Sequence, residues 1–275
     1  FWLITACAIK AKCSIRNSCV PKIYPCRNGS TAAVILVATE QVYVEDAYTR
    51  SCDASVTHSA SGAIQLDRTV FYVAGGGQPG DSGVLKLADG TTIEVLNTVK
   101  GEGAGEILHL VADDAPTPAA GTAVTAEIDW TRRHKHMRMH TCLHLLCAVI
   151  DAPVTGGQLS EEKARLDFDL PELLLDKAEI EARLNQLIAK DAPTATRWIS
   201  DEDLAAQPDL VRTMKVKPPS GQGRVRLLDV ADIDLQPCGG THVKSTGEIG
   251  PVTVRKVENK GKHNRRINIV FKEPE

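Results

Sequence analysis

The sequence predicts an α+β protein in which a small β-barrel domain precedes a mixed α+β domain. Two observations support this class. Short alternating segments separated by turn residues fill the chain up to about residue 130, with almost no helical pattern among them, and many short strands of this kind are typical of small barrels. Beyond residue 130, strand-like segments alternate with apolar helical runs, as in domains that pack helices on a sheet.

Length and composition limit the classes of function. The 275 residues allow one large or two small domains, and 43% hydrophobic with 24% charged residues is ordinary for a globular protein. Aromatic residues make up only 4% of the chain, which argues against a wide base-stacking platform. The net charge of −3 means that a nucleic acid must be met by a local basic patch. No apolar run approaches the ~20 residues of a membrane helix, so we expect no membrane association.

The eight cysteines do not form the pattern of a disulfide framework. Four lie at the start of the chain and four are scattered through the body: Cys7, Cys13, Cys19 and Cys26, then Cys52, Cys142, Cys147 and Cys238. We therefore expect a reduced, cytoplasmic protein, and a monomer is favoured.

Residues 1–38 differ in composition from the rest. They carry basic side chains and no acidic residue before Glu40, which is the character of a targeting segment. Against this interpretation, the segment contains no arginine-rich amphipathic helix and no clear cleavage site. It also lacks a CxxC pair, so a zinc knuckle is not expected. An unstructured or artefactual extension is the alternative, and we exclude it from the site.

The predicted barrel domain spans residues 39–130. Alternation and β-branched residues predict strands at 42–44, 54–58, 63–67, 69–74, 84–87, 92–96, 107–111 and 123–128. Asp89-Gly90 between two alternating runs predicts a hairpin. A linker-like stretch at 113–118 precedes the last strand, and we place the domain boundary near Trp130.

The second domain, residues 131–275, is mixed. Helices are predicted at 137–150, at 172–190 following Pro171, and at 201–206. Strands are predicted at 164–170, 224–230, 252–258 and 265–271, the last two flanking a basic hairpin.

Two motifs far apart in the chain predict a metal site. His140 and His144 lie four apart on a helical run, so both imidazoles project from one face. Nearly a hundred residues later, Cys238 and His242 flank two glycines that permit a tight turn. Three imidazoles and a thiolate are the ligand chemistry of zinc, and we expect one Zn2+ per chain.

The number of ligands raises a question of function. A catalytic zinc keeps three protein ligands and an open position, whereas four candidates are present. Either the coordination expands to five or one residue is not a ligand, so His242 is either a ligand or a proton-transfer group. A closed structural site is the alternative. The first motif lacks the glutamate that HExxH metalloproteases use as general base. His136, one turn before His140, is interpreted as facing solvent or RNA.

A glycine-rich stretch at 74–83 forms a second candidate site. It matches GxGxxG, but a strand follows it instead of the helix that a dinucleotide site requires. A tight barrel turn is one interpretation. The other is a loop whose backbone and Gln78 side chain line a pocket for a small polar substrate, formed by Gly75, Gly76, Gly77 and Gln78. Asp67 and Asp81 are interpreted as turn formers or catalytic groups.

Two basic patches are candidate phosphate contacts, although charge runs are often simply solvated. One surrounds the first metal motif and the other is the C-terminal hairpin. The residues expected to contact the phosphates of a nucleic acid are Arg132, Arg133, Arg138, Lys262, Arg265 and Arg266.

The motifs FYVAGGGQPGDSG, HTCLH, CGGTH and ENKGKHNRRI, in this order along the chain, resemble the AlaX family. These proteins are stand-alone homologues of the alanyl-tRNA synthetase editing domain, with a distant likeness to that of the threonyl enzyme. The resemblance covers about residues 41–272 and implies a zinc-containing editing domain of the threonyl/alanyl second-additional-domain type. Cys142 departs from the family's usual alanine and His263 from a common glycine. We expect Cys142 to be a core residue.

The resemblance implies a hydrolase that deacylates mischarged tRNA(Ala) in trans, carrying serine and also glycine. A metal-activated water would attack the aminoacyl ester at the acceptor end, and His242 and Gln78 are the candidate catalytic groups. The implied metal residues are His140, His144, Cys238 and His242. Hydrolysis of another aminoacyl-tRNA, or a non-catalytic zinc-containing RNA- or protein-binding relative, are the alternatives. Charging of tRNA is not expected, because these motifs leave no ATP-binding domain.

Overall fold

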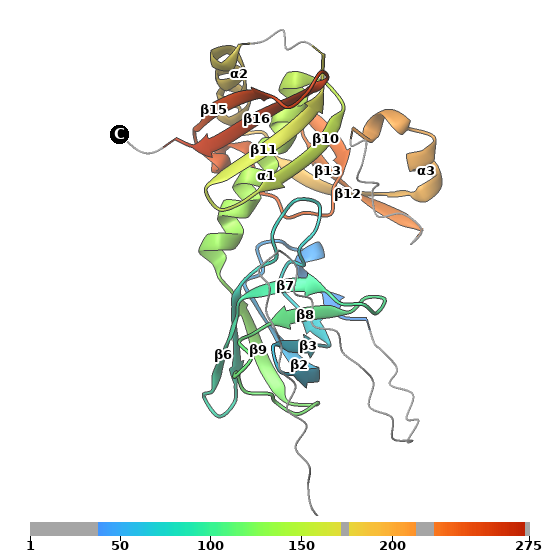
Figure 1. Cartoon of the computed structure of the whole chain (residues 1–275). Helices are drawn as coiled ribbons and strands as arrows, with labels where there is room; N and C mark the ends of the chain where they lie inside the picture. Colours follow the sequence, from blue (N-terminus) through green and yellow to red (C-terminus); the bar gives the residue numbers. More distant parts are fainter. Residues whose placement is uncertain (1–37, 172–175, 213–222, 273–275) are drawn as a thin grey trace, which may run out of the picture. The chain divides into compact units, whose positions relative to one another are not determined.

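The computed structural model describes residues 38–171, 176–212 and 223–272 (Figure 1). The expected extension therefore lies almost entirely outside the described residues. Up to residue 128 the elements are β1 (Glu40–Gln41), the 3-10 turn η1 (Val42–Val44), β2 (Ser51–Ala60), β3 (Ala63–Leu66), β4 (Arg68–Thr69), β5 (Gly83–Leu87), β6 (Thr92–Val95), β7 (Asn97–Lys100), β8 (Ile107–Leu110) and β9 (Ala123–Ile128).

The elements that follow mix helices with strands. They are α1 (Trp130–Ile150), β10 (Val154–Leu159), β11 (Lys163–Asp169), α2 (Lys177–Ala189), β12 (Thr194–Ser200), α3 (Asp201–Ala205), η2 (Pro208–Leu210), β13 (Arg224–Val230), β14 (Asp234–Pro237), η3 (Thr246–Ile249), β15 (Val252–Asn259) and β16 (Asn264–Phe271).

A seven-stranded antiparallel sheet curls around the core of the first part. Its strand order is β6-β5-β9-β2-β3-β8-β7, and Leu96 alone joins the two outermost strands in sequence. The expected hairpin at Asp89-Gly90 is present, because β5 pairs with β6 across that turn. Alternate residues of these strands point inward, as the pairs Ile64/Leu66 and Ile93/Val95 show by their complete burial.

A buried histidine in this core gives the protein a pH-dependent stability. His109 is fully buried, with Nδ1 3.0 Å from the Ile64 carbonyl oxygen and Nε2 2.8 Å from the Thr69 hydroxyl oxygen. Nδ1 must donate to the carbonyl, so Nε2 accepts from the hydroxyl and the ring is neutral. Burial lowers the pKa of His109 to about 4.

We expect this histidine to weaken the fold in mild acid. Because the folded-state pKa of about 4 lies below the unfolded value of about 6.5, the unfolded chain binds more protons between these pH values. Stability is therefore lost as pH falls through that window, by about 2 kcal/mol at pH 5 from this residue.

Urea unfolding of wild type and His109→Gln at pH 7.5 and pH 5 measures this contribution. The wild type should be the more stable protein at pH 7.5, and its advantage should shrink by about 2 kcal/mol at pH 5. Metal loss in acid affects both proteins alike. An advantage that does not change with pH contradicts the assignment.

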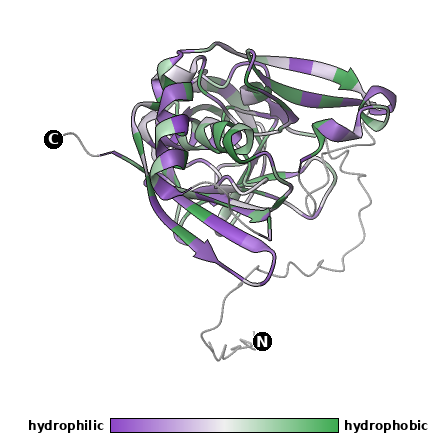
Figure 2. Cartoon of the chain, turned by 90° about the horizontal axis from the view of Figure 1, so that it is seen from above, coloured by the Kyte–Doolittle hydropathy of each residue, from purple (hydrophilic) through white to green (hydrophobic). Residues whose placement is uncertain are grey.

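Two sheets and α1 form the second part. β10-β11-β16-β15 is one antiparallel sheet and β12-β13-β14 is another. Twelve of the 21 residues of α1 are buried, and Figure 2 looks along this helix and shows other elements around it. Met137, Met139 and Leu145 of α1 are completely buried in the core that this part shares with α2.

The mixed class and most elements agree with the sequence-based prediction, and several details differ. Residues 42–44 form a 3-10 turn, and only Thr69 of the expected strand at 69–74 is in a strand. The helix expected at 172–190 begins at Lys177, capped by Asp176, while residues 172–175 lie outside the described part. The helix expected at 137–150 begins earlier, at Trp130, and β1, β7, β10, β12 and β14 were not predicted. Within the described residues no helix is long and apolar enough to cross a membrane.

Candidate metal centre

Helix α1 supplies the first two histidines. Asp129 begins it by accepting a hydrogen bond from the Arg132 backbone N–H, and the helix contains neither glycine nor proline. His140 and His144 lie one turn apart, with ring centroids 5.5 Å from each other, and both are buried. The local helix thus fixes the pair, as the spacing predicted.

The loop after β14 supplies the thiol and the third imidazole. The Cys238 backbone N–H donates to the Arg226 carbonyl oxygen at 3.0 Å, which ties the start of the loop to β13. Gly240 packs against His140, and a Cβ at this position would lie 2.2 Å from the imidazole ring. Only glycine allows the loop to approach the helix this closely.

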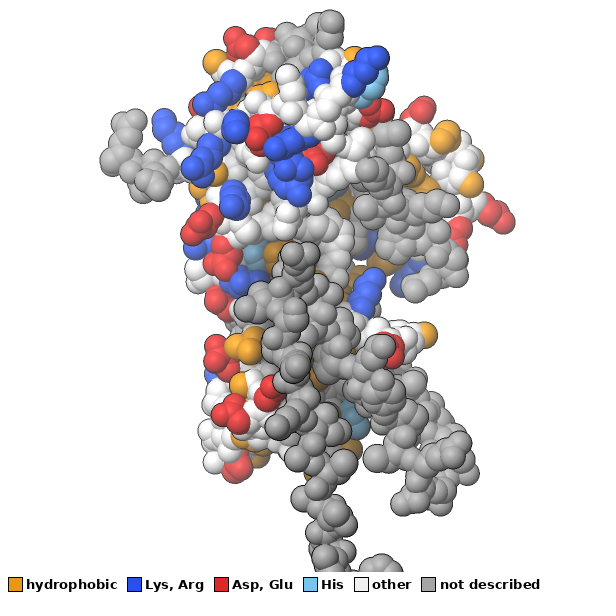
Figure 3. Space-filling view, viewed as in Figure 1, with side chains coloured by type: hydrophobic (Ala, Val, Ile, Leu, Met, Phe, Trp, Pro, Cys, Tyr) orange, Lys and Arg blue, Asp and Glu red, His pale blue; other side chains and the backbone are white. Residues whose placement is uncertain are grey.

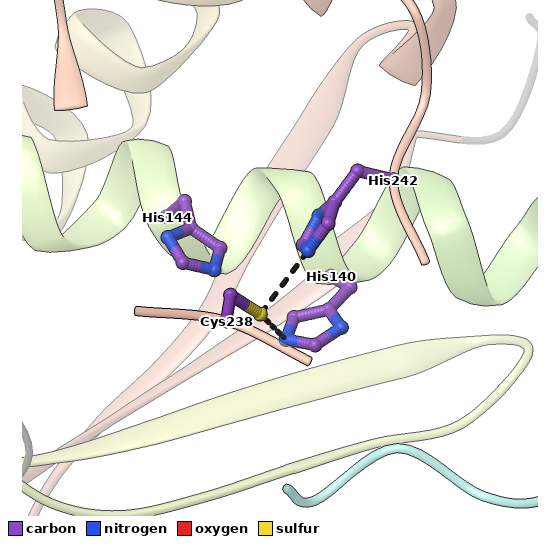
Figure 4. Close-up of side chains that lie close together, drawn as sticks. All are labelled: His140, His144, Cys238 and His242. Carbon is purple, nitrogen blue, oxygen red and sulfur yellow. Dashed lines mark hydrogen bonds between the residues drawn. The ribbon is translucent and has the colours of Figure 1, made fainter. Parts of the chain in front are cut away.

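The four predicted ligand residues come together (Figure 4). One ligand atom from each lies within 4.8 Å of all the others. Cys238 Sγ is 3.2 Å from His242 Nε2 and 3.6 Å from His140 Nε2. Ligand atoms that share one zinc ion lie about 3.3 to 3.7 Å apart, given the usual Zn–N and Zn–S lengths. The cluster can therefore hold a metal ion of this kind.

Hydrogen bonds at the other ring nitrogen set the tautomer of His140. The Thr241 backbone N–H, which can only donate, lies 3.2 Å from Gln78 Oε1. The same oxygen lies 2.8 Å from His140 Nδ1, so Nδ1 carries the hydrogen and Nε2 is left as a ligand. Gln78 Nε2 donates to the Thr241 hydroxyl at 2.8 Å, so the Gln78 side-chain amide is held at both of its polar atoms.

The same arrangement holds for the other two imidazoles. His144 Nδ1 donates to the Asp234 carboxylate at 2.9 Å. The Thr141 hydroxyl donates to the Met137 carbonyl at 3.0 Å and so accepts from His242 Nδ1, 3.2 Å away. All three histidines thus present Nε2 to Cys238. This ordered donor set is what a metal site requires, and it supports the fit independently of the motifs.

The electrostatics of the cluster favour a thiolate. Burial by itself would raise the pKa of the Cys238 thiol, but the three neighbouring histidines hold it well below its ordinary value. Burial also opposes charging of His144, yet the Cys238 thiolate and Asp234 raise its pKa to about 10. Burial and His140 lower the pKa of His242 to about 3. The thiolate is the form of cysteine that binds metals.

The glycine loop that precedes β5 reaches this centre. Gly75 and Gln78 exchange two backbone hydrogen bonds, and Gly76 and Gly77 take the positive φ angles of 58° and 84° that this tight turn needs. The Gly77 carbonyl accepts from the Leu159 N–H at 3.0 Å, which docks the loop on β10. Gln78 is buried and contacts a candidate metal ligand. Its predicted catalytic and substrate-binding roles remain predictions.

Arg133 is a correction to the predicted tRNA contacts. Its side chain is completely buried and forms an ion pair with Asp81 through Nε and Nη2. Nη1 also donates to the Ala47 carbonyl oxygen, and Nη2 to that of Val70. Complete burial keeps this side chain away from a phosphate, and its contacts hold α1 to the segment that precedes it. Asp81 is the buried partner in that pair.

The other residues predicted to contact phosphates are at least partly accessible, and most of them already form contacts within the protein. Arg132 binds Glu161, Arg138 donates to the Ile249 carbonyl and covers the Phe271 ring, and Arg266 binds Asp167. Arg265 donates to the Gly261 carbonyl on the hairpin, and Lys262 is exposed. Their contact with tRNA remains a prediction.

Two further residues of α1 test the sequence interpretation. His136 is 1% exposed and its Nδ1 has no hydrogen-bond partner among the described residues, so the expectation of a solvent- or RNA-facing side chain is wrong. Cys142 is completely buried, which confirms it as a core residue, and burial raises its pKa to about 12.

Sequence reasoning missed the residues that orient the imidazoles. Asp234 lies on β14 and Thr141 between the two helical histidines, and neither forms a motif with the ligands that it contacts. Only the position of Thr141, next to His140, could have suggested its role.

Comparisons with known proteins find relatives that match most of the chain. Residues 225–268 match the family described as the threonyl and alanyl tRNA synthetase second additional domain, and residues 36–132 match class II (A) tRNA synthetases. The chain is 37% identical over 238 residues to an alanyl-tRNA editing protein AlaX-M of Methanosarcina acetivorans, covering 83% of this chain and 97% of that protein.

Further relatives are of two kinds. An AlaX-M protein of Saccharolobus solfataricus is 35% identical over 239 residues, which cover 85% of this chain and 99% of that one. An alanine–tRNA ligase of Pyrococcus furiosus is 34% identical over 233 residues, which cover 80% of this chain but only 24% of the ligase.

Proposed function

The chain belongs to the AlaX-M family of alanyl-tRNA editing proteins, and from this premise we propose that it is a deacylase that clears mischarged tRNA(Ala) in trans. The proposed substrates are Ser-tRNA(Ala) and Gly-tRNA(Ala), and the reaction is hydrolysis of the ester at the acceptor end. The observation that carries the proposal is the buried cluster in which three imidazole Nε2 atoms and the Cys238 thiolate converge. A place in the cytoplasm goes with this function.

The proposed cofactor is Zn2+, held by His140, His144, Cys238 and His242. When bound, such an ion supplies Lewis acidity, which lowers the pKa of a water molecule and polarises an ester carbonyl. His242 is counted among the ligands because its Nδ1 is engaged by Thr141 and its Nε2 lies 3.2 Å from Cys238 Sγ. These contacts support a role for His242 in metal binding over one in proton transfer.

The chain's own residues hold this site and the substrate. Gly76 and Gly77 expose backbone beside Gln78, so we propose that they admit the small aminoacyl group next to the cluster. Serine and glycine differ little in size from alanine, which is why removal at a separate site is needed. Figure 3 shows Lys and Arg side chains gathered over β15 and β16, a surface proposed to meet the tRNA backbone.

The test is release of radiolabelled serine and glycine from tRNA(Ala), with Ala-tRNA(Ala) as the spared control. We expect fast release by the metal-loaded protein, and loss of activity in Cys238→Ala and after treatment with a chelator. Cys52→Ala removes a thiol of the barrel that lies outside the cluster and should remain active.

One outcome would overturn the proposal. If the folded, zinc-loaded protein releases no more serine or glycine than buffer does, the editing function falls. The non-catalytic, zinc-containing RNA- or protein-binding relative then takes its place.

A further inference from the structure

One face of the sheet β12-β13-β14 runs from the metal centre to solvent. The register pairs Trp198 with Arg226, and Val230 with Asp234. Paired residues share a face and side chains alternate along a strand, so Trp198, Arg226 and Asp234 all lie on the same face. Because Asp234 bonds His144, this is the face turned toward the metal cluster.

Arg226 connects this face to the ligand loop. Its Nη1 donates to the Gly240 carbonyl at 2.7 Å, and its own carbonyl accepts from the Cys238 N–H at 3.0 Å. Its Nε is buried and has no hydrogen-bond partner among the described residues. Its Nη2 contacts only the Thr196 hydroxyl, at 3.4 Å, so the guanidinium keeps donor capacity on the side of the face that carries Trp198.

The outer end of the face carries an exposed aromatic side chain. Trp198 is 39% exposed, and among the described residues only Leu96 is another large hydrophobic side chain exposed to this degree. The Arg224 guanidinium lies 4.3 Å from the centroid of the Trp198 ring. Residues beside Trp198 on this face are Thr196, Ser200, Arg224, Arg226 and Leu228. Leu228 is buried, so the neighbours of the aromatic ring that reach the surface are polar or cationic.

We propose that Trp198 and Arg224 form a stacking site for one base of the unpaired 3′ end of tRNA, and that Arg226 binds the adjoining phosphate. This inference rests on the proposed function, which brings the 3′ end to the cluster. Single-stranded RNA is bound by aromatic rings and guanidinium planes that stack on its bases, and by cations along its backbone.

The surroundings favour RNA over a protein partner. A hydrophobic peptide would need apolar residues around the ring, whereas this face offers two arginines. A chain with a net charge of −3 needs a local basic patch to bind nucleic acid, and the arginines on this face provide one. A single exposed tryptophan provides for one base, in keeping with the low aromatic content.

The test measures binding of a fluorescein-labelled CCA trinucleotide to the full chain by fluorescence anisotropy. Trp198→Ala should raise the Kd about tenfold, because one stacked base contributes that much or more. Trp198→Phe keeps an aromatic face and should retain most of the affinity. Leu96→Ala removes the other exposed hydrophobic side chain, which lies between β6 and β7, and should bind as the wild type does.

A second readout separates this inference from the proposed function. On Ser-tRNA(Ala), Trp198→Ala should raise KM about tenfold with little change in kcat, whereas release of serine from serine methyl ester should not change. If wild type and Trp198→Ala bind CCA with equal affinity, the stacking site is refuted, even if the protein deacylates its substrate. The exposed edge strand β12 would then be a candidate for pairing with a strand of a protein partner. Trp198-dependent CCA binding without deacylation supports the site and refutes the hydrolase.

Discussion

Replacing Asp81 by alanine will destabilise the folded protein by about 3 to 5 kcal/mol. Asp81 and Arg133 are both completely buried, and the Asp81 carboxylate accepts from Arg133 and from the Tyr72 N–H. Removal of the carboxylate leaves a guanidinium charge without a counter-charge in the interior. The cost of this uncompensated buried charge is larger than the net stabilisation that the ion pair itself provides.

Urea unfolding followed by circular dichroism measures this effect, with an exposed ion pair as the matched control. Lys86 and Glu127 are each about half exposed, so Glu127→Ala should change stability by about 1 kcal/mol or less. The double variant Asp81→Leu/Arg133→Met removes both charges and should recover most of the lost stability. A loss below about 1 kcal/mol in Asp81→Ala would contradict the role of the pair.

Removing a residue that orients an imidazole will lower zinc affinity about 10- to 100-fold. Asp234→Ala frees Nδ1 of His144, and Gln78→Ala frees Nδ1 of His140 together with the Thr241 amide. Each imidazole then samples orientations and tautomers in which Nε2 does not face Cys238. The affinity falls although all four ligands are still present.

Competition with a chromogenic chelator gives the zinc affinity of each variant independently of activity. Asp229→Ala is the matched control, because Asp229 lies on the same sheet as Asp234 but alternates to the opposite face, where it binds Arg197. Zinc binding by Asp234→Ala or Gln78→Ala that equals the wild type would show that the ligands hold their positions unaided. A loss in Gln78→Ala, in contrast, would mean that the barrel completes the metal centre.

The sequence by itself determined the features that depend on neighbours along the chain. The spacing of His140 and His144 places both on one helix face, and Gly240, between Cys238 and His242, lets their loop approach that helix. Alternation and the Asp89-Gly90 turn indicated strands and a hairpin that the structure contains. Helix and strand periods, and turn residues, act within a few residues, so they can be recognised without the fold.

Only the tertiary structure decided which polar residues are buried and what they contact. The charge run around Arg133 indicated a surface, but Arg133 and His136 are enclosed because α1 is buried on most of its circumference. Gln78 contacts His140 from 62 residues away, and Asp234 contacts His144 from 90 residues away. Such contacts arise when separate elements pack together. Each pair of ligands is therefore set locally by the chain, whereas the meeting of the two pairs and the orientation of the imidazoles are properties of the fold.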